Sequence, residues 1–160
     1  MQQEERKSGR FQDGTEQVIG ALIEVHRALG PGLLESAYEI CLCTELGLRQ
    51  LRFERQQTIP ICYKGVLVDC GYRVDVVVED RILLELKSVD RLLPIHEAQV
   101  VTYWRLANLP VALLVNFNVS VLRTGLRRLT REHPKTFRPS DLSVHPKIDP
   151  ETDPDGPGEP

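Results

Sequence analysis

The chain opens with two stretches in which apolar residues recur every three or four positions, the spacing of an amphipathic helix. The first stretch lies between Asp13, which can cap a helix, and Gly30, which can end one. The second runs from Leu34 until Gly47 stops the pattern. Two consecutive helices are therefore predicted at the start of the fold.

At Phe53 the pattern changes, because β-branched and aromatic residues begin to alternate with a period near two. This predicts strands through Val89, with a tight hairpin turn at Lys64-Gly65 between the triplets ICY and VLV. Later on, a third helix is predicted from about Ile95 to Ala107, and a buried strand from Val111 to Phe117.

A last strand or helix is expected around residues 119–129. The predicted order is therefore α, α, β, β, β, β, α, β and one undecided element, with no internal repeat. Such an order indicates an α/β protein with a mixed β-sheet flanked by helices.

The segment GYRVDVVVEDRILLELKSV predicts two antiparallel strands that turn at Glu79-Asp80-Arg81. Its even-numbered positions are aliphatic, so one face of this hairpin is expected to be core and the other to carry charge. The aliphatic positions are Val74, Val76, Val78, Ile82, Leu84 and Leu86, and the charged ones are Arg73, Asp75, Glu85 and Lys87. A turn centred on Asp80 sets Asp75 directly opposite Glu85, with Cβ atoms roughly 5 Å apart.

Two neighbouring carboxylates repel each other unless a cation or a proton lies between them. Hard oxygen ligands of this kind suit Mg²⁺ or Mn²⁺, and Lys87 could orient an attacking water or offset charge on a phosphate. The alternative is an exposed sheet face with a structural network of ion pairs. From these residues alone both interpretations stay open.

The composition of the 160-residue chain, 41% hydrophobic and 27% charged, is that of a globular protein with one domain. Its apolar runs are too short to span a membrane, and its polar start has no signal-peptide pattern, so a cytoplasmic location is expected. Four cysteines without a CxxC pair predict reduced, mostly buried thiols and argue against zinc.

Charge and proline content divide the chain into three parts. Residues 134–160 hold seven of the eleven prolines and six acidic against three basic residues, which predicts a largely disordered, Pro-rich acidic tail. Residues 1–12 are predicted to be flexible, which leaves 13–133 as the domain. Near its end a basic cluster could face phosphates or could simply be solvated; it consists of Arg123, Arg127, Arg128 and Arg131.

Asp75, followed ten residues later by Glu85-Leu86-Lys87, resembles the Asp...(Asp/Glu)-x-Lys signature of the PD-(D/E)XK nuclease superfamily. In addition, GLLESAY at 32–38 fits the pattern GxxExxY, and the chain looks like a member of the GxxExxY protein family within that superfamily. The resemblance covers about residues 17–118 and implies a restriction-endonuclease-like core, in the order α-βββ-α-β.

The resemblance also implies roles for particular residues. The catalytic set would be Glu35, Asp75, Glu85 and Lys87, with Gln99 and Tyr103 supporting the site. Asp75, Glu85 and the Leu86 carbonyl would bind Mg²⁺ or Mn²⁺. Val74 stands where the superfamily's name has proline. Without the resemblance, Glu35 could merely meet the helix dipole, and Gln99 and Tyr103 could be a pair on a helix surface.

Together these features favour a metal-dependent nuclease that hydrolyses phosphodiester bonds in DNA or RNA. The alternatives are a binding module that keeps the fold and holds nucleic acid or a protein without cleaving, and an interaction protein whose tail carries the function. The sequence leaves open whether the substrate is DNA or RNA, and whether the protein forms a homodimer.

Overall fold

The computed structural model describes residues 13–131. The helices are α1 (Thr15–Leu29), α2 (Glu35–Leu48) and α3 (Pro94–Ala107), with a short 3₁₀ helix η1 (Leu122–Gly125). The strands are β1 (Phe53–Thr58), β2 (Ile61–Tyr63), β3 (Val66–Val68), β4 (Arg73–Val78), β5 (Ile82–Lys87), β6 (Val111–Asn116) and β7 (Leu126–Thr130). The predicted flexible segment 1–12 and acidic tail 134–160 lie outside the described residues.

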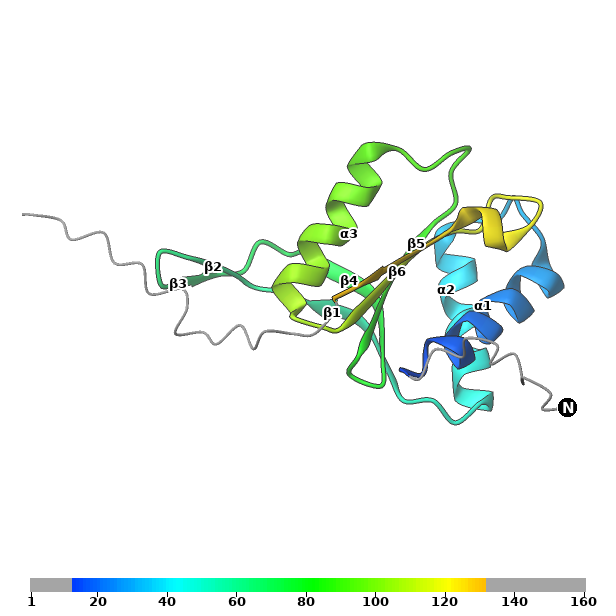
Figure 1. The fold of residues 1–160 in the computed structure, drawn as a ribbon, viewed down its shortest axis with the longest axis horizontal. Helices are drawn as coiled ribbons and strands as arrows, with labels where there is room; N and C mark the ends of the chain where they lie inside the picture. Colours follow the sequence, from blue (N-terminus) through cyan, green and yellow to red (C-terminus); the bar gives the residue numbers. More distant parts are fainter. Residues whose placement is uncertain (1–12, 132–160) are drawn as a thin grey trace, which may run out of the picture.

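Five of the strands form one mixed sheet in the order β1-β4-β5-β6-β7. Only β5 and β6 pair in parallel, joined by α3, and the other neighbours are antiparallel. The pair α1 and α2 covers one face of the sheet and α3 the other (Figure 1). The predicted mixed sheet flanked by helices is thereby confirmed, as is the order α-βββ-α-β for α2, β1, β4, β5, α3 and β6.

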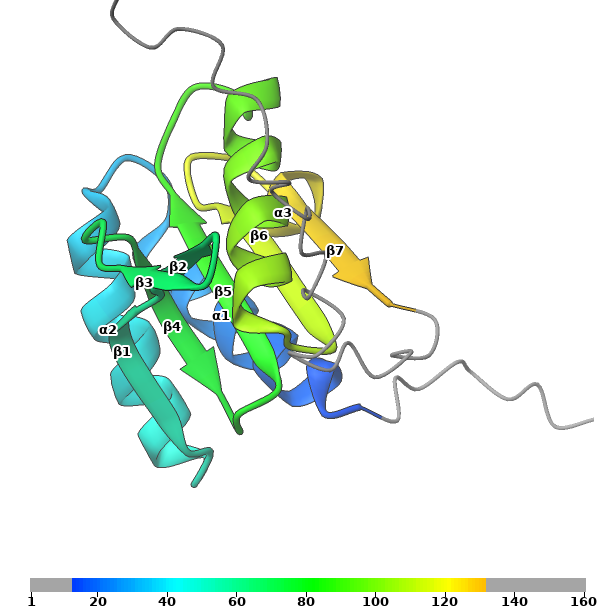
Figure 2. The same cartoon turned by 90° about the vertical axis from the view of Figure 1, so that its left-hand side faces the viewer.

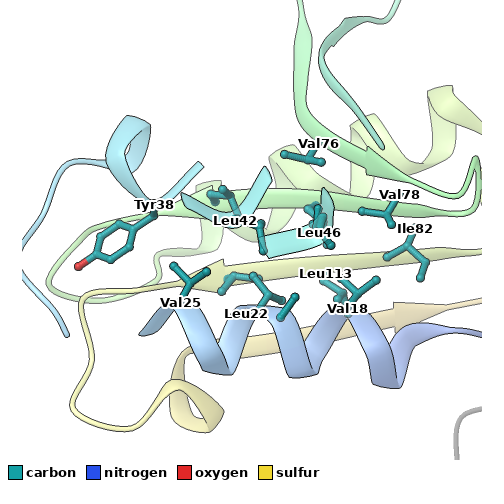
Figure 3. Close-up of a cluster of buried hydrophobic side chains, with 14 of the residues drawn as sticks. Val18, Leu22, Val25, Tyr38, Leu42, Leu46, Val76, Val78, Ile82 and Leu113 are labelled. Carbon is teal, nitrogen blue, oxygen red and sulfur yellow. The ribbon is translucent and has the colours of Figure 1, made fainter. Parts of the chain in front are cut away.

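Each face of the sheet has its own hydrophobic core. The larger core lies beneath α1 and α2, where helical spacing brings Leu22 and Leu42 against the strands (Figure 3). The smaller core lies beneath α3 and includes Leu83, Val100 and Leu114. Because both faces are covered, the central strands are buried almost along their whole length.

The predicted register of the β4–β5 hairpin is confirmed. Val76 pairs with Leu84 and Val78 with Ile82, so residue numbers sum to 160 across the turn. Glu79 and Asp80 in this turn both have φ of 53°, a left-handed conformation that closes a tight hairpin. In this register Asp75 and Glu85 lie at the open end of the hairpin, opposite the turn.

The predicted division of this hairpin into a core face and a charged face is wrong in two respects. The second face has a core of its own, and Val74 packs in it rather than with Val76. The pairing of β1 with β4 skips Gln56 and Asp75, and Gln56 has φ of 51°. This local turn of the backbone breaks the strict alternation beside Asp75.

Two element boundaries also differ from the prediction. Helix α2 continues through Gly47 to Leu48, because Gln50, with φ of 60°, takes the left-handed position that ends it. The strand region after residue 53 contains five strands rather than four. Pro60, which has no backbone N–H to donate, separates β1 from β2.

Strands β2 and β3 form a separate two-stranded sheet, inserted between β1 and β4, that extends away from the body on the side of α3 (Figures 1 and 2). We call residues 61–68 the ribbon. The predicted turn at Lys64-Gly65 is confirmed, with φ of 49° and 80°.

Cys62 in the ribbon and Cys70 just after it are exposed, so the expectation of mostly buried thiols is wrong for these two. None of the helices within 13–131 has the length and apolar character needed to cross a membrane.

Candidate active site

Asp75 and Glu85 lie on neighbouring strands at the end of the β4–β5 hairpin, next to the break in alternation described above. The backbone N–H of Leu86 donates to Oδ2 of Asp75 at 2.7 Å, which fixes the Asp75 carboxylate against β5. Glu85 is almost completely buried, with 3% of its surface exposed. A pair of acids is thus held in the sheet, where charges are rare unless they are compensated.

Lys87 supplies part of that compensation. Its Nζ lies 2.8 Å from Oε1 of Glu85, and both side chains are largely buried. The second oxygen of the carboxylate, Oε2 of Glu85, is buried without a hydrogen-bond partner among residues 13–131. A buried carboxylate oxygen in this state is costly unless a proton, a cation or a water molecule lies against it.

The electrostatics of the group follow from burial and from its neighbours. Burial, together with the nearby Asp75 carboxylate, raises the pKa of Glu85 to about 7. Burial also raises the pKa of Asp75, although the Leu86 N–H and Lys87 oppose the shift. For Lys87, burial lowers the pKa, but the hydrogen bond and the charge of Glu85 outweigh it and the net shift is upward. The lysine is therefore a cation beside two acids that resist ionisation.

Glu35 is the first residue of α2 and reaches the group from the other face of the sheet. Its negative charge acts on Asp75, Glu85 and Lys87, but it makes no hydrogen bond or ion pair with any described residue. Its position at the N-terminus of α2 also stabilises this carboxylate through the helix dipole. Glu35 is thus close enough to influence the charges and free to turn toward a ligand.

The loop before Glu35 is anchored by Tyr38, the last residue of the GxxExxY pattern. The Tyr38 hydroxyl donates to the Gly30 carbonyl at 2.5 Å and accepts from the Leu33 N–H at 3.2 Å. Its ring is fully buried and stacks on Phe117, with 4.3 Å between ring centroids. Tyr38 is therefore part of the core and also positions the start of α2.

Glu39, one helical turn after Glu35, was missed by the sequence analysis. Its carboxylate is buried and accepts hydrogen bonds from Arg55 Nε and Gln56 Nε2, both at 2.9 Å. Since Gln56 lies opposite Asp75 at the break in the β1–β4 pairing, Glu39 holds β1 at that point. The available signal was an acid on the face of α2 that otherwise carries Leu42 and Leu46.

Asn116, at the end of β6, is a second residue whose role was not predicted from the sequence. Its amide donates to the Val89 carbonyl at 2.8 Å and accepts from the Val89 N–H at 3.1 Å, so it extends the sheet by one pair. The N–H of Phe117 donates to the Lys87 carbonyl at 2.8 Å. These bonds fix the chain at Lys87 and directly after it.

A sequence model of the PD-(D/E)XK nuclease superfamily matches residues 12–129. The chain belongs to the PD-(D/E)XK nuclease superfamily. Neither a search of curated proteins nor a search of solved structures gives a match. Membership indicates nuclease activity and a nucleic-acid substrate, and nucleases of this superfamily generally use divalent metal ions.

The acidic group fits a divalent ion of the kind that PD-(D/E)XK nucleases use. Within 13–131 no three His, Cys, Asp or Glu side chains come together as a metal cage. Two carboxylates with an unpartnered oxygen match instead the preference of Mg²⁺ and Mn²⁺ for one or two acids plus several waters. A cation here would also offset the burial and the repulsion from Asp75 that together raise the pKa of Glu85.

The two helix residues expected to support the nuclease site lie on α3. Gln99 Nε2 donates to the Tyr103 hydroxyl at 3.1 Å, and Tyr103 packs in the core beneath this helix. The Tyr103 ring also contacts Tyr72, with 5.7 Å between centroids. Neither Gln99 nor Tyr103 hydrogen-bonds to Asp75 or Glu85 in the described part of the chain. They border the face of the sheet on which Glu85 lies.

The four arginines of the basic cluster do not form one surface. Arg128 pairs with Asp13 at the start of α1, and Arg131 stacks over Trp104 of α3 with 4.8 Å between the guanidinium carbon and the ring centroid. Arg123 and Arg127 are exposed, and Arg127 donates hydrogen bonds to the backbone carbonyls of Thr124 and Leu126. Of the cluster, these two are the most available to a phosphate.

Proposed function

We propose that this chain is a nuclease of the GxxExxY type that hydrolyses phosphodiester bonds with the help of Mg²⁺ or Mn²⁺. The observation that carries the proposal is the buried Glu85 carboxylate, with Asp75 beside it, Lys87 on one oxygen and no hydrogen-bond partner on the other among the described residues. A purely structural ion pair would satisfy both oxygens, because an unpaired buried polar atom is costly. The arrangement therefore favours a binding site over a structural network.

In this proposal Asp75, Glu85 and the carbonyl of Leu86 hold the ion. Bound there, the ion would polarise a phosphate oxygen and lower the pKa of a water molecule. Lys87, which stays protonated while bonded to Glu85, orients the attacking water or offsets charge that develops on the phosphate. Glu35, exposed and close to the same charges, supports the site as an acceptor for water.

The decisive experiment is a cleavage assay on labelled DNA and RNA with Mg²⁺, with Mn²⁺ and with EDTA. We expect metal-dependent cleavage by the parent and a loss on the order of a hundredfold or more for Lys87→Gln. Glutamine is chosen because it can still donate to Glu85 while the charge is removed. The control is Arg73→Gln, an exposed cation on β4, which should retain most of the activity.

If Lys87→Gln cleaves as fast as the parent, the proposed mechanism is wrong. If the parent cleaves no DNA or RNA with either metal, a binding module that keeps the nuclease fold becomes the better hypothesis. The cytoplasmic location stays a prediction from the sequence.

We further propose that Arg123 and Arg127 contact the phosphate backbone, with Arg128 and Arg131 at the border of that surface. Phosphate contacts release counterions, so affinity for nucleic acid should fall steeply with salt. In Arg123→Gln/Arg127→Gln the slope of log affinity against log salt should fall by about 2, near 0.9 per contact. An unchanged slope in this variant would exclude the two arginines from the interface.

A further inference from the structure

The ribbon exposes its apolar side chains, whereas the central strands of the main sheet are buried on both faces. Val66 is 61% exposed, Leu67 72% and Tyr63 63%. Isolated two-stranded hairpins are marginally stable in water, and exposed apolar strand edges tend to pair with other chains. The ribbon therefore has both the surface and the energetic reason to bind a partner.

The two edges of the ribbon differ in their capacity to pair. In a hairpin closed by a two-residue turn, the residues flanking the turn bond to each other, and the next pair points its N–H and C=O outward. Cys62 pairs with Leu67, so these two residues face outward on the β2 and β3 edges respectively. On the β2 edge, Pro60 two residues earlier has no N–H to offer. The β3 edge has Leu67 and, directly after the strand, Asp69, both with a backbone N–H to donate.

The sequence of β3 is symmetric about Leu67, since a valine stands on each side. Antiparallel pairing of two β3 strands about Leu67 sets residues whose numbers sum to 134 opposite each other. Val66 of each copy then faces Val68 of the other, and the two Leu67 residues face each other in a hydrogen-bonded pair. Each Lys64 comes within one position of the other copy's Asp69, the only acid in or next to the ribbon.

We propose that β3 pairs antiparallel with β3 of a second copy of this chain, in the register centred on Leu67. Self-complementary apolar pairs and two symmetry-related pairs of opposite charges fit a second copy. They do not fit a nucleic-acid backbone, because the ribbon has one cation, Lys64. The joined ribbons form a four-stranded sheet with Ile61, Tyr63, Val66 and Val68 of both copies on one face.

The proposed pairing of two β3 strands does not depend on the proposed nuclease reaction. It does involve a strand that is connected directly to β4 of the candidate site. Asp69 and the three residues after it connect β3 to β4, which carries Asp75. Tyr72 in this connection rests on Tyr103 of α3. A dimer joined through β3 therefore holds two candidate sites in one assembly.

The first test is the oligomeric state of the full chain, measured by sedimentation velocity over a wide range of concentrations. We expect a monomer–dimer equilibrium whose dissociation constant rises on the order of a hundredfold or more in Leu67→Asp, since two buried leucines become two facing acids. The matched control is Leu48→Asp, at a leucine 76% exposed at the end of α2. This variant should dimerise like the parent.

A second variant separates strand pairing from simple contact of apolar side chains. Leu67→Pro keeps an apolar residue but removes the outward N–H, so it should also abolish the dimer. The melting temperature, measured at a concentration where the parent is monomeric, should change little in Leu67→Asp, which shows that this variant folds.

Cross-linking tests the register. Facing Cα atoms in a hydrogen-bonded antiparallel pair lie about 5.5 Å apart, within reach of a disulfide. In a chain with Cys62→Ser and Cys70→Ser, Leu67→Cys should therefore form a covalent dimer on oxidation, and Leu48→Cys should not. A parent that is monomeric at every concentration, a dimer that survives Leu67→Asp or Leu67→Pro, or a Leu67→Cys protein that does not cross-link would each overturn the proposal.

Discussion

The β4–β5 hairpin and the β2–β3 ribbon are built by the same local rules but end in opposite environments. Both close on left-handed turn residues, and both pair antiparallel in a single register. The first carries acids into the interior, where Glu85 is buried, whereas the second carries Leu67 into solvent. Secondary structure thus follows from local sequence, while burial depends on what packs against each face.

Each hairpin departs from the usual distribution of polar and apolar groups, and each departure has a cost. A buried carboxylate oxygen without a partner destabilises the folded state, and exposed leucine and valine side chains forgo the gain of burial. The cation proposed for the first hairpin and the second copy proposed for the ribbon would each remove that cost. The comparison can be tested by perturbing the two hairpins in parallel.

The largest difference is expected from the same substitution made in both hairpins. Leu84→Ala, at a fully buried residue beneath α1 and α2, should lower the free energy of unfolding by about 2 to 5 kcal/mol, because it leaves a cavity in the core. Leu67→Ala should change it by no more than about 0.5 kcal/mol when the protein is dilute and monomeric. Urea unfolding measures both values. Equal losses would mean that the ribbon is buried in the monomer.

The register of the β4–β5 hairpin could be predicted from the sequence because burial on one face tolerates no slip by one residue. Val76, Val78, Ile82 and Leu84 all point into one core in a single arrangement, and this sets Asp75 near Glu85. The mixed sheet was predictable because the spacing of apolar residues differs clearly between helices and strands along most of the chain.

The rest of the site depends on contacts between segments far apart in the sequence. Glu39 reaches Arg55 and Gln56, and Asn116 reaches Val89, across separations that no local pattern reports. The position of Val74 in the core beneath α3 depends on a backbone turn in a neighbouring strand, at Gln56. Strand alternation in one segment could not reveal these arrangements.

The next effect in size is a dependence of stability on pH that arises mainly from Glu85. Its pKa is raised from 4.5 to about 7 in the folded protein, so the folded state binds more protons than the unfolded state between these values. Stability of the metal-free protein should therefore fall as pH rises from about 4.5 to about 7, by on the order of 2 to 3 kcal/mol. Urea unfolding at a series of pH values in EDTA measures this.

The other shifted groups can be told apart from Glu85. Asp13 and Glu79 have lowered pKa values, so their effects end below about pH 5, and the raised pKa of Lys87 acts only in the alkaline range. Burial also raises the pKa of Asp75, so this carboxyl contributes to the slope with the same sign as Glu85. Glu85→Gln should remove most of the slope and be more stable than the parent at pH 7. A slope that persists in Glu85→Gln would assign it to another group.

The smallest expected effect is stabilisation by the ion itself, and it distinguishes the two acids of the candidate site from an exposed one. An ion that binds only the folded state adds about 1.4 kcal/mol at roughly ten times its dissociation constant, so Mn²⁺ should raise the melting temperature of the parent. Asp75→Asn and Glu85→Gln should lose this rise, because each removes one of the two carboxylates that we propose as ligands. Asp69→Asn, which removes an exposed acid beside the ribbon, should keep it. Differential scanning fluorimetry with Mn²⁺ and with EDTA gives all four values. An equal rise in all four proteins would show that the ion binds elsewhere, and that the unpartnered oxygen of Glu85 is satisfied by a proton instead.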